Sequence, residues 1–488
     1  MNYFMIRYIL SSVICFVGIF LLLPAATAGI YQEKEGFLYL IIGLACMLIG
    51  FWGRRRKPKS SVFYSKEGFA AVALSWIILS LIGALPMYLT GEFPSYIDAL
   101  FETISGFTTT GSSILSDVET LSRGTAFWRC FTHWIGGMGV LVFIMAVMPL
   151  SDSSSMHLMR AESPGPAVGK LVPKVKTTAM ILYGIYVVFT VIEIIALLIA
   201  GMPLFDSMTL TFGTVGTGGF GLLNSSIASY STAVQIIITV FMIICSINFT
   251  VYYMFLIKRP KEALMCEEMR YYLLIVFGSA LLIAFNIRAS FASFGKAFQQ
   301  AIFQVASVIS TTGFATADFN LWPEFSRMIL VLLMFVGACA GSTGGGVKVS
   351  RLIIMVKSVR NEIMSVTHPR SVQKVHMDGR RIPDNVVKTV LCYLAGYVVI
   401  LIVSVLLISL DNFDMTTNFT AVMATFNNVG PGLNRVGPTG NFGGFSVLSK
   451  LVLIFDMLVG RLELYPMLVI FAPGLWRIHP HRHVGKVQ

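Results

Sequence analysis

The feature that most constrains this chain is a series of ten long apolar runs. About 20 helical residues cross the hydrocarbon core of a bilayer, and each run approaches or exceeds that length. Hydrophobic residues make up 56% of the chain and charged residues only 12%, which excludes a soluble globular protein. We therefore expect ten membrane-spanning helices, near residues 4–24, 37–52, 68–90, 125–150, 178–202, 231–257, 271–287, 326–347, 386–410 and 446–472.

The first apolar run is expected to stay in the mature protein. It contains Tyr8, Cys15 and Phe20, it lacks a clear small-residue cleavage site, and a second run follows it. These features differ from those of a secretory signal. The seven cysteines occur singly in or beside apolar runs, which favours buried packing thiols over disulfides or a metal site.

Positive charge is concentrated in alternate connections between the runs. Most of the 36 Lys and Arg residues lie at Arg7, in loops 54–66, 151–176, 258–270 and 347–388, and in the tail from residue 473. The positive-inside rule places these segments and both termini in the cytoplasm, so the net charge of +12 is an orientation signal. The basic run from Arg54 to Lys59 borders a membrane helix, which favours contact with anionic lipid over nucleic-acid binding.

Four external segments share one pattern, a partly apolar stretch that ends in Thr, Ser, Asn and Gly. They superpose on one glycine each, namely Gly111, Gly219, Gly313 and Gly430. These glycines are 108, 94 and 117 residues apart, so a similar unit occurs four times. Each unit consists of a long apolar helix, a stretch of about 10–13 residues that is too short to span, a polar loop and a second long helix.

The repeats predict an all-α polytopic membrane protein. Its four helix, pore helix, filter and helix repeats surround a pseudo-fourfold pore, and a pair of transmembrane helices precedes them. The expected units are an N-terminal two-helix unit at 1–66, pore repeat 1 at 67–176, pore repeat 2 at 177–268, pore repeat 3 with a glycine-rich loop and a cytoplasmic hairpin at 269–383, and pore repeat 4 with the tail at 384–488.

The four polar loops indicate a cation pore. Irregular backbone at membrane depth must be buried in protein or line water, and glycine lets consecutive carbonyls point toward a shared axis. Rings of carbonyl oxygen can replace the water shell of a monovalent cation, and the negative ends of short helices add to the attraction. No filter loop carries a carboxylate, which favours K⁺ or Na⁺ over Ca²⁺ or Mg²⁺. For any single loop, a simple re-entrant turn is the alternative. The candidate ligands are Thr109, Thr110, Gly111, Thr217, Gly218, Gly219, Thr311, Thr312, Gly313, Asn428, Val429 and Gly430.

The sequence resembles the Trk/Ktr/HKT superfamily of potassium transporters, and most closely its bacterial TrkH branch. The resemblance covers the whole chain and rests on the four loops, on HWIGGMG at His133–Gly139, on GACAGSTGGGVK at Gly337–Lys348 and on GRLELYP at Gly460–Pro466. The N-terminal helix pair, generally lacking in Ktr-type subunits, is present. Gly111 matches the potassium-selective pattern, whereas repeat four departs from Thr-x-Gly with Asn428-Val429-Gly430.

The resemblance implies K⁺ as the transported ion, with no organic cofactor and no enzymatic activity. It further implies a homodimer in the bacterial inner membrane and a cytosolic TrkA-type nucleotide-binding subunit that opens a gate.

The expected gate is the glycine-rich segment Gly337–Gly346. Five glycines in ten residues cannot remain regular helix at roughly 1 kcal/mol each relative to alanine. Close helix packing through small residues is the alternative to a mobile gating loop. Arg461, which is expected midway along the last helix, either forms an electrostatic barrier in the pore or holds that helix through polar contacts. The candidate gating residues are Gly337, Gly341, Gly344, Gly345, Gly346, Lys348 and Arg461.

Other signals are weaker. Asp378-Gly379 between alternating residues predicts a β-hairpin in the longest cytoplasmic loop, where a cytosolic partner could dock. The GxGxxG pattern at 216–221 lacks a βαβ context, so it does not predict nucleotide binding. His133 is better explained by packing or a helix-end hydrogen bond than by proton handling, and Glu193 by a paired or protonated carboxyl than by ion contact.

Two functions from different classes compete. The first is a channel-like potassium uptake protein, and the second is a secondary transporter that couples K⁺ uptake to H⁺ or Na⁺. A secondary transporter often has two inverted repeats, whereas an even number of spans between successive filters gives all four units one orientation. A membrane enzyme would require a nucleophile, a metal cluster or an acid pair, and the sequence offers none of these.

Overall fold

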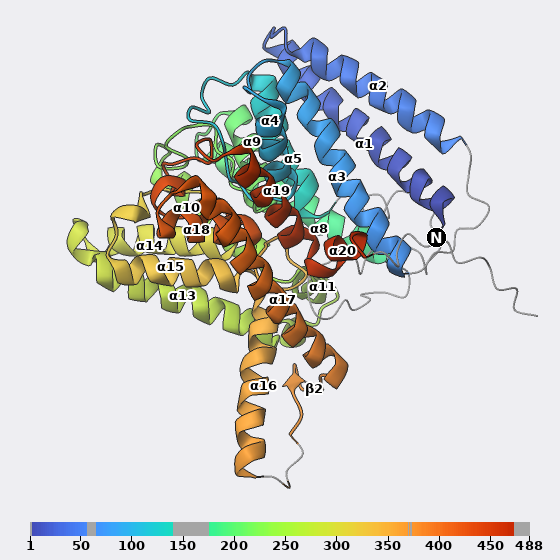
Figure 1. The fold of residues 1–488 in the computed structure, drawn as a ribbon. Helices are drawn as coiled ribbons and strands as arrows, with labels where there is room; N and C mark the ends of the chain where they lie inside the picture. Colours follow the sequence, from blue (N-terminus) through green and yellow to red (C-terminus); the bar gives the residue numbers. More distant parts are fainter. Residues whose placement is uncertain (1, 56–64, 140–174, 369, 371–372, 473–488) are drawn as a thin grey trace, which may run out of the picture.

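The computed structural model describes residues 2–55, 65–139, 175–368, 370 and 373–472. Part of the basic run after Arg54, the end of the span expected at 125–150 and the C-terminal tail lie outside these residues. At the N-terminus, α1 (Tyr3–Ile30) packs along α2 (Gly36–Arg54) on the outer side of α3 (Figure 1). A Cβ on Gly18 would meet the carbonyl oxygen of Gly43, so these glycines allow the close contact.

The rest of the chain repeats one arrangement four times, as expected, and the all-α fold class is confirmed. Repeat 1 contains α3 (Ser65–Leu89), α4 (Tyr96–Phe107) and α5 (Arg123–Gly137). Repeat 2 contains α8 (Val175–Ile199), α9 (Leu204–Val215), α10 (Thr232–Cys245) and α11 (Phe249–Leu256), followed by the short α12 (Pro260–Leu264). Repeat 3 contains α13 (Glu267–Ile287), α14 (Phe294–Ile309), α15 (Glu324–Val336) and α16 (Val349–Thr367). Repeat 4 contains α17 (Asp384–Ile408), α18 (Met415–Phe426), α19 (Val447–Leu462) and α20 (Leu464–Ile470).

The prediction of ten continuous spans is wrong for the second long helix of repeats 2, 3 and 4, whereas that of repeat 1 extends beyond the described residues. In the described part of the chain, six helices are long and apolar enough to cross a membrane, and the bent pair α10 and α11 would make a seventh. That pair bends by 88°. The apolar runs continue across these breaks, and apolar composition alone therefore does not show where a helix ends.

The breaks have local causes. In repeat 3, α15 stops at Gly337, which has a φ of 69°, and α16 starts only after Lys348. In repeat 4, Glu463 has a φ of 61° and separates α19 from α20. Arg461 consequently lies in the last turn of α19, which corrects its expected place midway along the helix. The short helix α14 has 16 residues, more than the expected 10–13.

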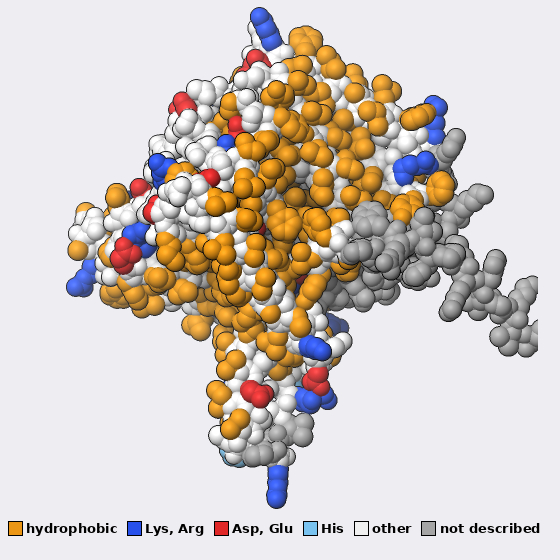
Figure 2. All heavy atoms as spheres, viewed as in Figure 1, with side chains coloured by type: hydrophobic (Ala, Val, Ile, Leu, Met, Phe, Trp, Pro, Cys, Tyr) orange, Lys and Arg blue, Asp and Glu red, His pale blue; other side chains and the backbone are white. Residues whose placement is uncertain are grey.

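The outer surface is that of a membrane protein. Figure 2 shows hydrophobic side chains over most of one face, with charged groups gathered toward its margins. Exposed apolar residues follow the outer helices, for example Val188 and Ile195 on α8, Leu274 on α13 and Leu406 on α17. Such a surface is unfavourable in water and favourable against lipid.

A stem projects from the helical bundle on one side. It consists of α16 and of a hairpin with strands β1 (His376–Met377) and β2 (Arg380–Arg381) (Figure 1). The predicted hairpin is confirmed: the strands pair antiparallel, and Asp378 and Gly379 have φ of 50° and 72°, as a type I′ turn requires.

Candidate functional site

One short helix in each repeat precedes the polar loop, namely α4, α9, α14 and α18. All four of these helices end in the same motif. In repeat 1, the N–H of Thr109 donates to the Gly106 carbonyl at 3.1 Å, and that of Thr110 donates to the Ser105 carbonyl at 2.8 Å. This pair of bonds defines a Schellman motif, in which the first donor residue is left-handed. Equivalent bonds follow α9, α14 and α18, with donors at Thr217 and Gly218, Thr311 and Thr312, and Asn428 and Val429.

The left-handed residues are unusual ones. The φ angles are 54°, 55°, 59° and 55° at Thr109, Thr217, Thr311 and Asn428. A β-branched residue rarely adopts this conformation, which costs roughly 1–2 kcal/mol per residue. Strain of this kind is concentrated at functional sites. Three strained threonines in equivalent places therefore single out the loops as the candidate site.

The four aligned glycines close the loops into a ring. Their φ angles are 80°, 79°, 85° and 99° at Gly111, Gly219, Gly313 and Gly430. A Cβ on each glycine would collide with the carbonyl oxygen that precedes the glycine of the next loop. The oxygens belong in turn to Gly218, Thr312, Val429 and Thr110, and each lies less than 3.0 Å from the Cβ position. The contacts run from loop 1 through loops 2, 3 and 4 and back to loop 1, so the pseudo-fourfold ring is complete.

One cavity joins the four loops. It has a volume of about 140 Å³, and all four aligned glycines line it. Each short helix ends directly at this ring, which places the negative ends of four helix dipoles around a common centre. The arrangement favours a cation and offers it backbone oxygen.

Repeat four reaches the same geometry with different side chains. Asn428 tolerates the left-handed conformation better than threonine does. Its side-chain N–H₂ donates to Thr110 Oγ1 at 2.9 Å and to the Met457 carbonyl at 3.0 Å, which ties loop 4 to loop 1 and to α19. Asn427 donates to Tyr397 at 2.8 Å. The departure from Thr-x-Gly therefore leaves the backbone pattern intact.

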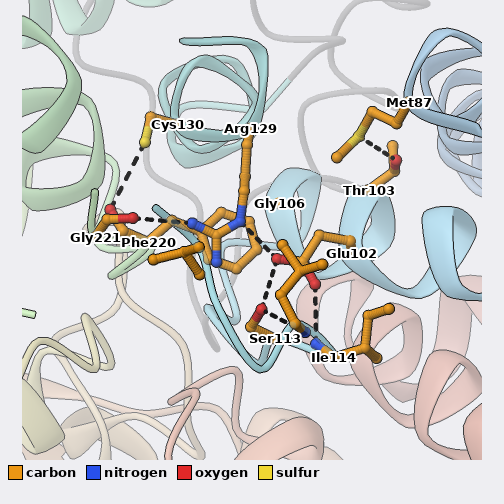
Figure 3. Close-up of polar contacts among 12 residues, drawn as sticks. Met87, Glu102, Thr103, Gly106, Ser113, Ile114, Arg129, Cys130, Phe220 and Gly221 are labelled. Atoms are coloured by element: carbon orange, nitrogen blue, oxygen red, sulfur yellow. Dashed lines mark hydrogen bonds and ion pairs between the residues drawn. The ribbon is translucent and has the colours of Figure 1, made fainter. Parts of the chain in front are cut away.

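A buried ion pair supports loops 1 and 2 (Figure 3). Arg129 on α5 pairs with Glu102 on α4 at 2.6 Å, and both side chains are almost fully buried. Glu102 also accepts from the N–H of Ile114 at 3.0 Å, while Arg129 donates to the Gly221 carbonyl at 3.0 Å. Because each charge bonds to a different loop, the pair fixes the distance between the two loops.

His133 makes a second bridge. Its Nδ1 lies 2.7 Å from the Gly106 carbonyl, and its Nε2 accepts from the N–H of Phe220 at 3.2 Å. The ring thus joins the end of α4 to loop 2 in a single tautomer. Both ring nitrogens serve structural contacts, in agreement with the expected helix-end hydrogen bond.

The glycine-rich loop, residues 337–348, lies against the ring formed by the four loops. The N–H of Gly345 donates to Thr311 Oγ1 at 2.6 Å, and that of Gly346 donates to the Asn427 carbonyl at 3.0 Å. Cys339 donates to the Ser246 carbonyl at 3.0 Å, at the break between α10 and α11. The loop therefore bonds to repeats 2, 3 and 4 at once. The predicted interruption of the helix is confirmed.

The structure places the two candidate gating cations in this loop region. Lys348, which is almost fully buried, donates through Nζ to the Gly344 carbonyl. Arg461 donates to the Thr343 carbonyl at 2.8 Å and to Thr109 Oγ1 at 3.3 Å. It also donates to the carbonyls of Gly136 and Gly137 at 2.5 and 2.6 Å, and thereby joins repeat 1 to the loop. Carbonyl contacts, one of the two roles considered for Arg461, are thus present.

The expected site residues consequently form two layers, a ring of loops and a glycine-rich loop beside it. Sequence reasoning missed the Glu102–Arg129 pair, although two charges within apolar segments are a signal for buried partners. It also missed that Glu463 pairs with Arg351 on α16 at 2.5 Å, beside the break in the last helix. No group of three or more His, Cys, Asp or Glu suited to a metal occurs among the residues that the structure describes.

Comparison with known proteins identifies the family. The family model described as "TrkH: Cation transport protein" matches residues 40–478. The Trk system potassium uptake protein TrkH of Escherichia coli K12 is 35% identical over 95% of this chain and 97% of its own length. The Trk system potassium uptake protein TrkG of the same strain is 31% identical over 93% and 94%. The crystal structure of the potassium transporter TrkH from Vibrio parahaemolyticus superposes with a TM-score of 0.88, at 31% identity, over 98% of this chain and 100% of that one. The chain therefore belongs to the TrkH family of cation transport proteins.

Proposed function

We propose that this protein takes up K⁺ through a channel-like pore whose selectivity filter is the ring of four loops. The observation that carries the proposal is the fourfold recurrence of one backbone conformation, with a left-handed residue and a positive-φ glycine at equivalent places in every loop. Backbone carbonyls in such a ring replace the hydration shell of K⁺. The potassium uptake named for its relatives supports the choice of ion.

The twelve residues expected to bind the ion are the three at the end of each loop motif. Eight of them have a positive φ, and the other four supply the carbonyl oxygens that the aligned glycines contact, so all twelve lie at the ring. Their backbone oxygens, rather than side-chain carboxylates, are the proposed ligands. A carbonyl ring without net charge holds a monovalent cation weakly enough to release it.

The glycine-rich loop is the proposed gate. It bonds directly to filter residues of repeats 3 and 4, and Arg461 ties it to repeat 1. A guanidinium next to Thr109 also repels K⁺ electrostatically in a narrow, low-dielectric path. Both effects obstruct conduction while the loop is in place. Conduction then requires that the loop move away from the ring.

The proposed setting is the inner membrane of a bacterium, with both termini and the stem in the cytoplasm. We further propose a homodimer and a cytosolic TrkA-type nucleotide-binding subunit that moves the gate. The positive-inside pattern of the loops and the projecting stem support this orientation. Anionic lipid at the basic connections completes the set of proposed partners.

Secondary transport coupled to H⁺ or Na⁺ is the second candidate. The observation that favours it is Glu193, a fully buried carboxyl in the last third of α8 that faces Thr214 near the end of the short helix α9. A carboxyl at this depth can carry a proton. Coupling would make K⁺ flux depend on the gradient of the second ion, whereas a channel responds only to the K⁺ gradient and the voltage.

The test of the proposed gate is rubidium uptake into liposomes that contain a variant lacking residues 341–345. The expected result is a higher basal uptake than in the wild type, with Rb⁺ preferred over Na⁺. Uptake at or below the wild-type level, in protein that still elutes as a single folded species, would show that the loop is not a gate. Replacement of the exposed residues Ala289, Ser290 and Ala292 by glycine serves as the control, because these residues lie outside the ring and the change leaves Ser293, the N-cap of α14, in place.

A further inference from the structure

Two helices at the gate begin without a cap from their own flanking residues. The residue before α13, Cys266, makes no side-chain capping bond, and neither does Lys348 before α16. The first N–H groups of a helix need acceptors, and carboxylates are favoured there because the helix dipole is positive at this end. Other parts of the chain supply both acceptors.

The first acceptor comes from the cytoplasmic hairpin. Asp378, in the turn between β1 and β2, accepts from the N–H of Glu267 through Oδ1 at 2.7 Å. Glu267 is the first residue of α13. In return, the N–H of Asp378 donates to the Glu267 carboxylate at 3.3 Å. The hairpin turn and the start of α13 are thus joined by a reciprocal pair of bonds.

The second acceptor is the next residue of α13. Glu268 accepts through Oε1 from the N–H of Ser350 in α16, at 3.0 Å, and from the N–H of Ala340 in the glycine-rich loop, at 2.7 Å. One carboxylate oxygen therefore holds both the loop and the helix that follows it. Glu268 is only 3% exposed, so water does not compete for these bonds.

Lys357 of α16 ties the same elements together from the cytoplasmic side. Its Nζ lies 2.5 Å from the Glu267 carboxylate and 2.8 Å from the carbonyl oxygen of His376 in β1. The hairpin, the first turn of α13 and α16 consequently form one hydrogen-bonded unit that ends at the gate. A displacement of the hairpin cannot leave the first turn of α13 unchanged.

We propose that Glu268 is a positioning residue that holds the glycine-rich loop against the filter, and that the hairpin controls Glu268 through the cap that Asp378 places on α13. This inference rests on the gating role proposed above. Glu267 and Glu268 are consecutive, so a shift of the hairpin that turns the first residue also turns the second away from Ala340. A cytosolic partner that pulls on the stem would release the loop by this route.

The test compares four variants in liposomes. Glu268→Ala removes the shared acceptor, Glu268→Gln keeps one acceptor oxygen, and Asp378→Gly removes the cap while glycine still suits the turn. Arg380→Gln changes an exposed residue of the same hairpin and is the matched control. The first readout is basal rubidium uptake. The second is the rate of Cys339 alkylation, determined by mass spectrometry, because this thiol lies in the loop and is fully buried.

We expect Glu268→Ala and Asp378→Gly to raise uptake about tenfold, a usual size for coupling between sites, and to speed Cys339 alkylation. Glu268→Gln and Arg380→Gln should stay near the wild type in both readouts. The double variant Glu268→Ala/Asp378→Gly should exceed Glu268→Ala by little, because both changes act on one route.

If Asp378→Gly shows the same rubidium uptake and the same rate of Cys339 alkylation as the wild type, the hairpin does not control the position of Glu268. Asp378 is exposed and glycine suits the turn, so Asp378→Gly should fold. This variant therefore still tests the proposal if Glu268→Ala does not fold. If the 341–345 deletion raises uptake while Glu268→Ala, folded, does not, the gate stands and Glu268 does not position it. If the 341–345 deletion does not raise uptake either, the proposed gating role of the glycine-rich loop is wrong, and the inference about Glu268 is wrong with it.

Discussion

Replacing Gly111 with serine tests how the filter ring is built. At a φ of 80°, any residue with a Cβ loses roughly 1–2 kcal/mol of stability relative to glycine. In addition, the new Cβ would collide with the carbonyl oxygen of Gly218 in the next loop. Gly218 as a whole cannot move away, because its N–H is bonded to the Gly213 carbonyl at 2.7 Å, so the collision is relieved by rotation of the Gly218 carbonyl. The substitution therefore displaces one oxygen of the ring.

The size of the effect follows from the interaction that is lost. A hydrogen bond or dipole contact to a charged group contributes about 1.5–3 kcal/mol, and each 1.4 kcal/mol changes an equilibrium by a factor of about ten. If K⁺ loses one well-placed oxygen of the ring and Na⁺ does not, the K⁺/Na⁺ permeability ratio should fall about tenfold to a hundredfold. The assay is the shift of the reversal potential under bi-ionic conditions.

Gly91→Ser is the matched control. Gly91 has nearly the same φ, 79°, and no atom lies within 4 Å of its Cβ position. Gly91 lies in the same repeat, outside the ring. Serine at Gly91 therefore has the same backbone cost as serine at Gly111, but its Cβ does not collide with a carbonyl of the next loop. An unchanged permeability ratio in Gly111→Ser, with both variants equally stable, would refute the assignment of Gly111 to the filter.

Three further predictions concern charged residues. Arg461→Ala should raise basal rubidium uptake severalfold, since it removes both a positive charge and the bond to the Thr343 carbonyl; a lower melting temperature without added uptake would leave only a structural role. Glu102→Ala should destabilise the fold by roughly 3–5 kcal/mol, because it leaves Arg129 buried and unpaired, and a melting temperature near that of the wild type would contradict this. In liposomes with a fixed K⁺ gradient, uptake by the wild type and by Glu193→Gln should depend equally little on an imposed pH gradient. A strong dependence in the wild type that Glu193→Gln abolishes would support proton coupling instead.

The repeat architecture could be predicted because it depends on patterns that are local in sequence. Runs of apolar residues give helices, and a polar loop with glycine that recurs at similar spacing gives the ring of four loops. The alignment on Gly111 and its three counterparts already selects positions that need a positive φ. Asp378-Gly379 likewise determines its own turn.

The parts that could not be predicted depend on distant contacts. Nothing near Thr109 in the sequence shows that it becomes left-handed, because the conformation is stabilised only when the Schellman motif meets the other loops. The break at Glu463 arises where Arg351 of another helix supplies a partner, and the apolar pattern continues through it. Glu268 looks like an ordinary acid in the first turn of a helix, yet it bonds to a loop 72 residues away.

The central claim, a K⁺-selective filter formed by four loops, is tested most directly by recording from the purified wild-type protein in a planar bilayer with K⁺ on one side and Na⁺ on the other. The account predicts single-channel currents whose reversal potential lies far from zero, negative on the K⁺ side, as a high K⁺/Na⁺ permeability ratio requires, and does not depend on a pH difference across the bilayer. A reversal potential near zero, or a current that follows the pH gradient at fixed K⁺, would contradict it.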